Sequence, residues 1–357
     1  KGTAHKKSSV INGYLDKLGG ELNAYTTKEE IVLHATVLKE DLMKASSLLM
    51  EIATSATFPE NEVNTERGVV IDEIKSDNPA EDIYDRFEEK LFAGHPLTNP
   101  ILGSVKSVKE ITSEELRRFV KEKFVPEAMA FTIVADIDEK RMEAGLLKLV
   151  GKFFADFRPS GNGLVRPARV ELCNVFDEMI SRKTHEANAV VGGYAPSLYE
   201  EQERPATVLL SNILAGPAMN SILNSILREK HGWVYGVESS YTQYADTGIL
   251  AISLGCEKEN LDRCLAAIDK EILKLQTQEL TERKLNAAKK QLLGQLAISS
   301  DNGEAQCLSM GKSLLAYDKV WTGAETRSQI EGITSGQIME MTCRIFAPGK
   351  TSRLTMI

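Results

Sequence analysis

The sequence predicts an α+β chain of two homologous domains, each an antiparallel-rich sheet with helices packed on one face. Three observations predict this fold class. The chain has 357 residues, more than one ordinary hydrophobic core supports. In each half, strand-like patterns are followed by several helix-like patterns and a closing strand. A helix and the segment after it also occur twice.

The duplication is visible at the end of each half. Ile-Thr-Ser begins a predicted helix at residue 111 and again at residue 333. The helices end at Phe124 and Phe346, and apolar strands follow over 128–134 and 351–357. Each helix begins with a Ser/Thr N-cap signal. The same elements at one spacing indicate a duplicated domain.

Periodicity gives the elements of the first half in order. Residues 8–18 read as a helix that Gly19-Gly20 ends, because glycine adopts the left-handed conformation of a helix C-cap. The alternation of apolar residues predicts strands over 21–27 and 30–38, which makes His34 a packed or rim residue rather than a ligand. Helices are predicted over 41–56, 60–75, 80–92 and 113–123.

The second half repeats this order. Strands are predicted over 189–193, 234–244 and 248–255, and helices over 203–214, 219–230, 261–276, 281–298 and 335–346. The Pro-, Ser- and Gly-containing segment 158–163 propagates neither helix nor strand and is predicted to link the halves. The predicted domains are therefore residues 1–157 and 164–357.

Composition excludes several classes of protein. The net charge is −8, and nucleic-acid binders need a basic surface, so no nucleic-acid partner is expected. No run of eighteen apolar residues occurs, so no membrane span is expected. The five cysteines are odd in number and lack C-x-x-C spacing, which favours free thiols and the cytoplasm. A periplasmic location stays open, because the segment that would hold a signal peptide is not shown.

Two carboxylates stand out in the first half. Glu66 and Glu73 lie seven residues apart in the predicted helix 60–75, which is two helical turns, so both side chains project from one face and can serve one centre. The alternative is a solvated acidic face. Thr-Glu-Arg recurs at residues 281–283, but seven residues after Glu282 stands Lys289. An ammonium group has no lone pair for a metal, so the asymmetry predicts metal chemistry in one half only.

The chain resembles the M16 metallopeptidases, the insulinase/pitrilysin type with an inverted zinc motif. The resemblance rests on Lys-Gly-Thr at residues 1–3, Gly-Gly-Glu-Leu-Asn-Ala-Tyr-Thr at 19–26, Glu-Arg-Gly at 66–68 with Glu73, and Leu-Arg-Glu-Lys at 227–230 through Tyr235. These motifs have the order and spacing of the family over nearly the whole chain. The resemblance implies the LuxS- and processing-peptidase-like fold.

In that family an H-x-x-E-H motif supplies two zinc-binding histidines and a general base, and Lys-Gly-Thr follows it closely. None of the five histidines of this sequence forms such a motif. The sequence thus holds only the third ligand that the resemblance implies, Glu73, and one carboxylate cannot make a catalytic zinc site. The segment that carries the motif was either cut off, disordered or lost from the natural protein. Because the first residue is Lys and not Met and the chain begins directly with a helical pattern, we expect the motif upstream of Lys1.

The resemblance also implies roles for other residues. Glu66 would orient a ligand by hydrogen bond; alternatively it is a carboxylate favoured by the helix dipole. Arg228 and Tyr235 would hold the carbonyl of the scissile peptide bond. The alternative makes Arg228 a cation at a helix C-terminus and Tyr235 a sheet aromatic.

Asn23 and Ala24 would lie on an edge strand that pairs with the substrate backbone. One departure from the family is Ile222, which stands where the family commonly has arginine, after a loop with fewer glycines. This departure puts the loop's substrate contacts in doubt.

The sequence is therefore interpreted as a zinc-dependent endopeptidase that hydrolyses peptides or small unfolded proteins held as an added strand inside a chamber. Four such domains close a chamber and one chain supplies two, so the resemblance implies a dimer. One chain keeps both Glu66 with Glu73 and Arg228 with Tyr235, which favours a homodimer. The alternative is a non-catalytic partner or structural subunit in a heterodimer with another M16 chain. A weaker third interpretation is a plain peptide-binding scaffold.

Overall fold

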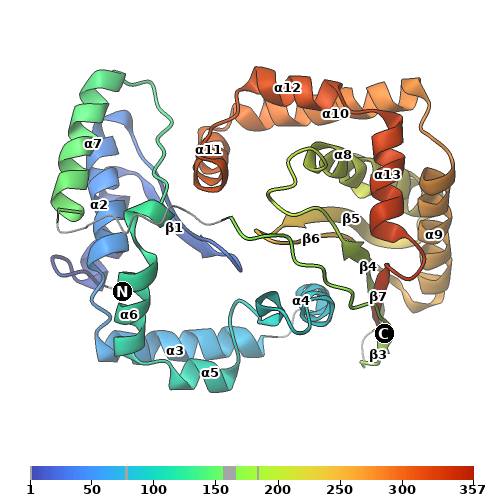
Figure 1. Ribbon diagram of the computed structural model, residues 1–357. Helices are drawn as coiled ribbons and strands as arrows, with labels where there is room; N and C mark the ends of the chain where they lie inside the picture. Colours follow the sequence, from blue (N-terminus) through green and yellow to red (C-terminus); the bar gives the residue numbers. More distant parts are fainter. Residues whose placement is uncertain (1, 77–78, 156–165, 183–184) are drawn as a thin grey trace. The chain divides into compact units, whose positions relative to one another are not determined.

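The computed structural model describes residues 2–76, 79–155, 166–182 and 185–357 (Figure 1). The chain forms two compact units. Unit 1 comprises Lys1–Ser76, Ile101–Val165 and Ser299–Trp321, and unit 2 comprises Asp77–Pro100, Arg166–Ile298 and Thr322–Ile357. Each unit thus includes a segment from the other half of the chain. The predicted link 158–163 lies outside the described residues, and the sequential domain boundary stays a prediction.

Unit 1 contains a small antiparallel sheet of two strands, β1 (Glu21–Thr26) and β2 (Ile31–Thr36). Gly19 precedes the sheet with φ 67°, the left-handed geometry predicted for the end of the first helical segment. The helices of this unit are α1 (Ser8–Asn12), η1 (Asp16–Leu18), η2 (Lys39–Asp41), α2 (Leu42–Ser55), α3 (Glu60–Lys75), α5 (Val105–Glu110), α6 (Ser113–Lys123), η4 (Pro126–Ala128), α7 (Glu139–Phe153) and α11 (Gly303–Tyr317).

The predicted strand over residues 128–134 is wrong. The chain makes the short helix η4 there and then continues as irregular backbone. Instead of joining a ladder, this segment is held by α11, because Thr132 Oγ1 donates to the Cys307 carbonyl at 3.0 Å. A strand needs a partner, and in the described part of unit 1 the sheet contains β1 and β2 alone.

Unit 2 is built on a five-stranded sheet with the order β3-β7-β4-β6-β5. Its strands are β3 (Asp177–Ile180), β4 (Glu186–Tyr194), β5 (Val234–Gln243), β6 (Gly248–Glu257) and β7 (Ser352–Met356). β3 and β7 are parallel, and the other neighbours are antiparallel. Its helices are α4 (Pro79–Leu91), η3 (Pro96–Thr98), α8 (Arg204–Ala215), η5 (Asn224–Lys230), η6 (Lys258–Asn260), α9 (Leu261–Thr277), α10 (Glu282–Ser300), α12 (Gly323–Glu331) and α13 (Ser335–Phe346).

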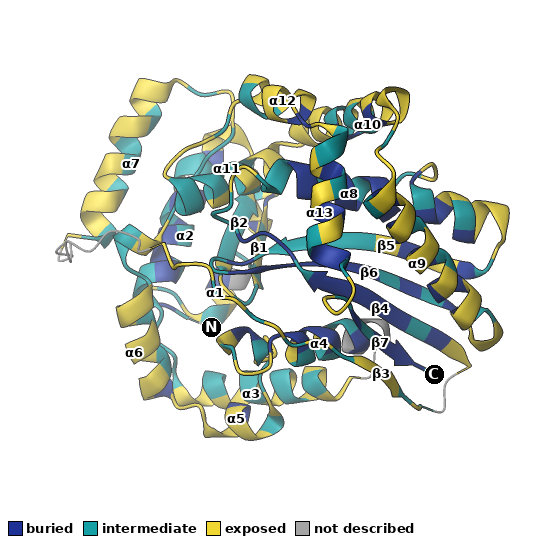
Figure 2. Cartoon of the chain, turned by 45° about the vertical axis from the view of Figure 1, so that its right-hand side comes forward, coloured by how far each residue is buried: buried dark blue, intermediate teal, exposed yellow. Residues whose placement is uncertain are grey.

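Helices cover both faces of this sheet, and Figure 2 shows how strongly β4 and β6 are buried. Ala189 and Val191 of β4 face a core shared with α8, α9 and α13. Val190, between them, faces a second core, to which α4 contributes Phe87. The α+β class is therefore confirmed, but the expectation of helices on one face is wrong for unit 2. Alternation alone cannot reveal a covering helix that comes from the other half of the chain.

The duplicated helices begin as the sequence predicts. Thr112 caps α6 and Thr334 caps α13, and each makes a capping box with the residue three positions later, Glu115 or Gln337. Lys289 of α10 donates to the Glu331 carbonyl at 2.7 Å. Its ammonium group thus contacts α12. Within the described residues, no helix is both long and apolar enough to cross a membrane.

Candidate functional site

Helix α3 carries the two predicted carboxylates of unit 1. Glu66 is half-buried, whereas Glu73, two turns further along, is exposed. Arg67 fixes this helix, since its guanidinium donates to the Val108 carbonyl at 3.2 Å and to the Ile111 carbonyl at 2.7 Å. The segment before α6 therefore sets the orientation of the helix face that bears Glu66 and Glu73.

Strand β1 carries Asn23 and Ala24, and both residues are exposed. They pair with His34 and Leu33 of β2. In the part of the chain that the structure describes, β1 is bonded to β2 along one edge, and its second edge has no strand beside it. The backbone at Asn23 and Ala24 is thus placed to accept an added strand.

His34 belongs to the packed face of this small sheet. Its Nδ1 lies 3.3 Å from a Glu304 carboxylate oxygen of α11, and its ring stands edge-on to Tyr25 with centroids 6.1 Å apart. These contacts are those of a packed residue, as the strand alternation predicts, and not those of a metal ligand.

Arg228 and Tyr235 flank a turn in unit 2. Arg228 lies in η5, which is a seven-residue π-helix, and its side chain is exposed. The turn after it is closed by a 2.8 Å hydrogen bond from the Trp233 amide to the Leu227 carbonyl, and Gly232 takes φ 61° there. π-helical turns are rare and occur frequently at functional sites.

Tyr235 is the extra residue of a β-bulge in β5. Val234 pairs with Cys256 and Gly236 pairs with Gly255, so Tyr235 has no partner in the ladder. Its side chain is 57% exposed. A bulge changes the direction of a side chain, and such bulges are common beside active sites. The π-helix and the bulge make the backbone irregular on both sides of this turn, and the sequence pattern predicts neither.

The environment of Tyr235 keeps its phenol protonated. Partial desolvation, and after it the carboxylates of Glu257 and Glu186, raise the pKa of the Tyr235 phenol. Glu186 and Glu257 are directly paired across β4 and β6. At neutral pH the hydroxyl is therefore a hydrogen-bond donor.

In the loop before η5, where the sequence departs from the family pattern, polar side chains hydrogen-bond to the loop's own backbone. The Ser221 hydroxyl and the Asn224 amide both donate to the Gly216 carbonyl at 3.2 Å, and both side chains are buried. Ile222 packs against the larger core of unit 2. These residues therefore stabilise the loop and do not present polar groups to a ligand.

The residues of this sequence do not by themselves form a zinc site. Among the described residues, no group of three or more His, Cys, Asp or Glu side chains is placed to hold a metal. A catalytic zinc needs three protein ligands, and Glu73 offers one carboxylate. The structure brings Glu66 and Glu73 together on one helix, and Arg228 and Tyr235 together around one turn.

Sequence models of one family match most of the chain. Residues 1–105 match the model described as "Insulinase (Peptidase family M16)", and residues 110–292 match "Peptidase M16 inactive domain". A Streptomyces coelicolor protein called an uncharacterized zinc protease is 27% identical over 95% of this chain and 74% of its own length. A Bacillus subtilis protein with the same description is also 27% identical, over 97% of this chain and 83% of its own.

Solved structures share the fold. A peptidase M16 inactive domain from Pseudomonas fluorescens aligns over 99% of this chain and 85% of its own, with a TM-score of 0.82 and 20% identity. A protease from Helicobacter pylori aligns over 100% of this chain and 86% of its own, with a TM-score of 0.84 and 17% identity. Together with the sequence matches, which cover both halves, these likenesses lead to one conclusion: the chain belongs to the M16 peptidase family.

Proposed function

We propose that the protein, with its zinc motif complete, is a zinc-dependent endopeptidase that hydrolyses peptides or small unfolded proteins. Family membership and the name zinc protease given to its relatives support this proposal. The observation that carries it is the exposed pair Arg228 and Tyr235, placed by a π-helix and a bulge on either side of one turn. Both π-helical turns and β-bulges occur frequently at functional sites.

The substrate would bind as an added strand along β1. Backbone groups at Asn23 and Ala24 would hydrogen-bond an extended peptide whatever its side chains, which gives broad specificity. Both residues are exposed, which supports access of a peptide to this edge.

Arg228 and Tyr235 would act on the carbonyl of the peptide bond. A guanidinium and a protonated phenol are both donors, and the oxygen of an amide gains negative charge as the carbonyl is attacked. Arg228 would contact the ground-state carbonyl as well, because its side chain is the longer of the two. Tyr235 would contribute most in the transition state, where negative charge develops on the carbonyl oxygen.

Zinc would be held by Glu73 together with the two histidines of the family's H-x-x-E-H motif, and Glu66 would orient a ligand. The test is Glu73→Gln in the protein that carries the complete motif, with Asp72→Asn as the matched control on the same helix. Glu73→Gln should lower zinc affinity at least about 10- to 100-fold, the loss typical of outer-shell changes, and leave the circular dichroism spectrum unchanged. Unchanged zinc content and activity would show that the wrong carboxylate is assigned.

We further propose a homodimer in the cytoplasm. One chain retains both Glu66 with Glu73 and Arg228 with Tyr235, which supports two identical subunits. The cysteines are free thiols, which supports a reducing compartment.

The rival function is a non-catalytic partner, which the description of the second family model as an inactive domain favours. A purified, zinc-loaded protein that cleaves peptides only after a second M16 chain is added would establish the rival.

A further inference from the structure

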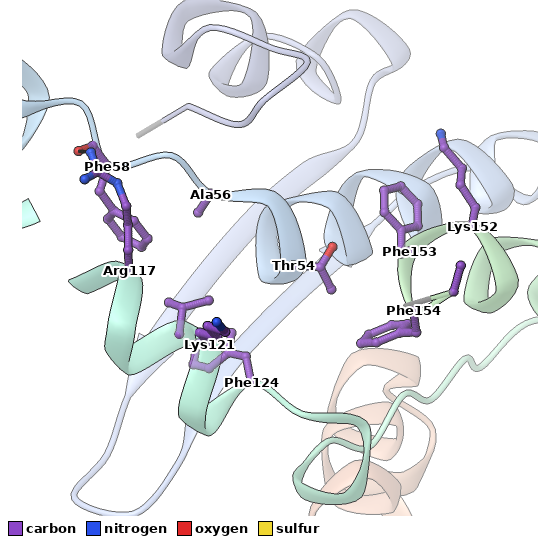
Figure 3. Close-up of a pocket in the computed structure, with 11 residues that line it drawn as sticks. Thr54, Ala56, Phe58, Arg117, Lys121, Phe124, Lys152, Phe153 and Phe154 are labelled. Carbon is purple, nitrogen blue, oxygen red and sulfur yellow. Dashed lines mark hydrogen bonds between the residues drawn. The ribbon is translucent and has the colours of Figure 1, made fainter. Parts of the chain in front are cut away.

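A hollow of about 400 Å³ lies in unit 1 where α2, α6 and α7 approach one another (Figure 3). This volume is at the lower end of ordinary ligand pockets. The lining residues come from the end of α2 and the segment after it, from one face of α6, and from the end of α7. They are Thr54, Ala56, Phe58, Arg117, Val120, Lys121, Phe124, Lys152, Phe153, Phe154 and Ala155.

The lining combines positive charge with aromatic rings. Three lining residues are cationic, Arg117, Lys121 and Lys152, and none is acidic. Four are phenylalanines, and all four are half-buried, so their rings are neither core residues nor fully solvated. Lys152 Nζ lies 4.7 Å from the centre of the Phe153 ring. A ligand that complements this lining has a negative charge and an apolar part.

One face of α6, together with its C-cap residue Phe124, supplies four of these residues. Arg117, Val120, Lys121 and Phe124 are spaced i, i+3, i+4 and i+7, which places them along one side of a helix. The helix therefore presents its apolar and cationic side chains to the hollow in alternation.

Phe58 is held in a strained conformation at the rim. Its φ is +49°, which is rare for a residue other than glycine, and it precedes Pro59, which restricts it further. Arg117 stabilises this backbone, donating to the Thr57 carbonyl at 3.0 Å and to the Phe58 carbonyl at 3.1 Å. Strained residues persist where their surroundings fix them, and they cluster at ligand sites.

We propose that this hollow binds the C-terminal residue of a peptide. The α-carboxylate would lie beside Lys121 of α6, and a large apolar side chain would lie against the phenylalanines. Arg117 would position Phe58. This inference rests on the proposed function, because a peptidase meets free peptide C-termini on its substrates and generates them as products. It adds a preference for substrates that end in an aromatic or large aliphatic residue.

The test is fluorescence anisotropy with a Gly/Ser decapeptide that is labelled at its N-terminus and ends in Phe. The Gly/Ser body gives little strand pairing, so binding reports the C-terminal residue. The free acid should bind about tenfold more tightly than the C-terminal carboxamide and than the same peptide ending in Gly, the lower end for a charge-assisted contact. The difference between acid and carboxamide should shrink as salt is added.

Substitutions locate the binding. The variant Lys121→Gln should lose about the same tenfold for the free acid and nothing for the carboxamide. The matched control is Lys123→Gln, which removes an exposed lysine of α6 outside the lining and should bind normally. Circular dichroism checks that both variants fold.

Equal binding of acid and carboxamide, or equal loss in Lys121→Gln and Lys123→Gln, would overturn the proposal. So would the absence of saturable binding. Cleavage of internal peptide bonds by the protein with its complete zinc motif is measured separately with C-terminally amidated substrates. The failure of this inference is therefore distinct from the failure of the peptidase assignment.

Discussion

Removing the Phe92 ring should destabilise unit 2 strongly. Phe92 directly follows α4 in the sequence and has no solvent exposure. Its ring centroid lies 5.5 Å from that of Tyr244 and 6.1 Å from that of Tyr194, both from the second half of the chain. Phe92→Ala therefore removes contacts between the exchanged segment 77–100 and the sheet of unit 2.

The magnitude follows from burial. A fully buried Phe→Ala change costs about 3–5 kcal/mol, because the transfer free energy of the ring is lost and a cavity remains. With an m-value near 3 kcal/mol per molar urea, the unfolding midpoint should fall by roughly 1–1.7 M. Phe119→Ala on α6 is the control; its side chain is 46% exposed, so it should cost less than about 1 kcal/mol.

The two tryptophans allow the unfolding of each unit to be measured by fluorescence. Trp233 lies in unit 2 and Trp321 lies in unit 1, so Trp321→Phe leaves a fluorescence signal from unit 2 alone. In that background, Phe92→Ala should lower the urea midpoint and Phe119→Ala should not. Equal midpoints for Phe92→Ala and its parent would refute the assignment of segment 77–100 to unit 2.

Glu51, which accepts hydrogen bonds from Thr3 and Lys6, should make unit 1 acid-sensitive. Burial raises the pKa of Glu51, but the hydrogen bonds from Lys6 and Thr3 outweigh burial, so the net effect is a lowered pKa. The ionised carboxylate therefore stabilises the fold fully above a pH of about 4.3, and this contribution is lost as the pH falls through the folded pKa. Glu51→Gln should weaken the fall in unfolding free energy at acid pH, measured by Trp321 fluorescence, and an unchanged pH dependence would contradict this. In the zinc-loaded protein, Tyr235→Phe should lower turnover about 10²–10³-fold with zinc content and peptide binding unchanged; full turnover would make Tyr235 a sheet residue only. The chain of the printed sequence should bind no stoichiometric zinc, and chelator-sensitive zinc in metal analysis would disprove that.

Signals between residues close in the sequence were sufficient to predict where several helices begin and end. Thr112 and Thr334 cap their helices because a side-chain hydroxyl and the third residue of the helix interact within one turn. Gly19 ends its helical segment because glycine tolerates positive φ. These interactions depend on residues a few positions apart, so the sequence pattern contains them.

Features that depend on distant residues were not predictable in this way. The segment 128–134 has the composition of a strand, yet a strand forms only where a partner lies beside it. The bulge at Tyr235 depends on its pairing with β6, and the π-helix around Arg228 has no pattern of its own. The family resemblance selected Arg228 and Tyr235 without indicating the backbone that presents them.

The exchange of segments between the units has a consequence for the nascent chain. Phe92 and its neighbours in segment 77–100 leave the ribosome well before β6, whose last residue is Glu257, is complete. At about 5–20 residues per second, that interval is roughly 10 to 30 s. The final strand of the same sheet, β7 (Ser352–Met356), is made later still. The apolar side of α4 must therefore stay exposed until β6 and β7 have been synthesised, which makes this segment a target for chaperones that hold unfolded chains.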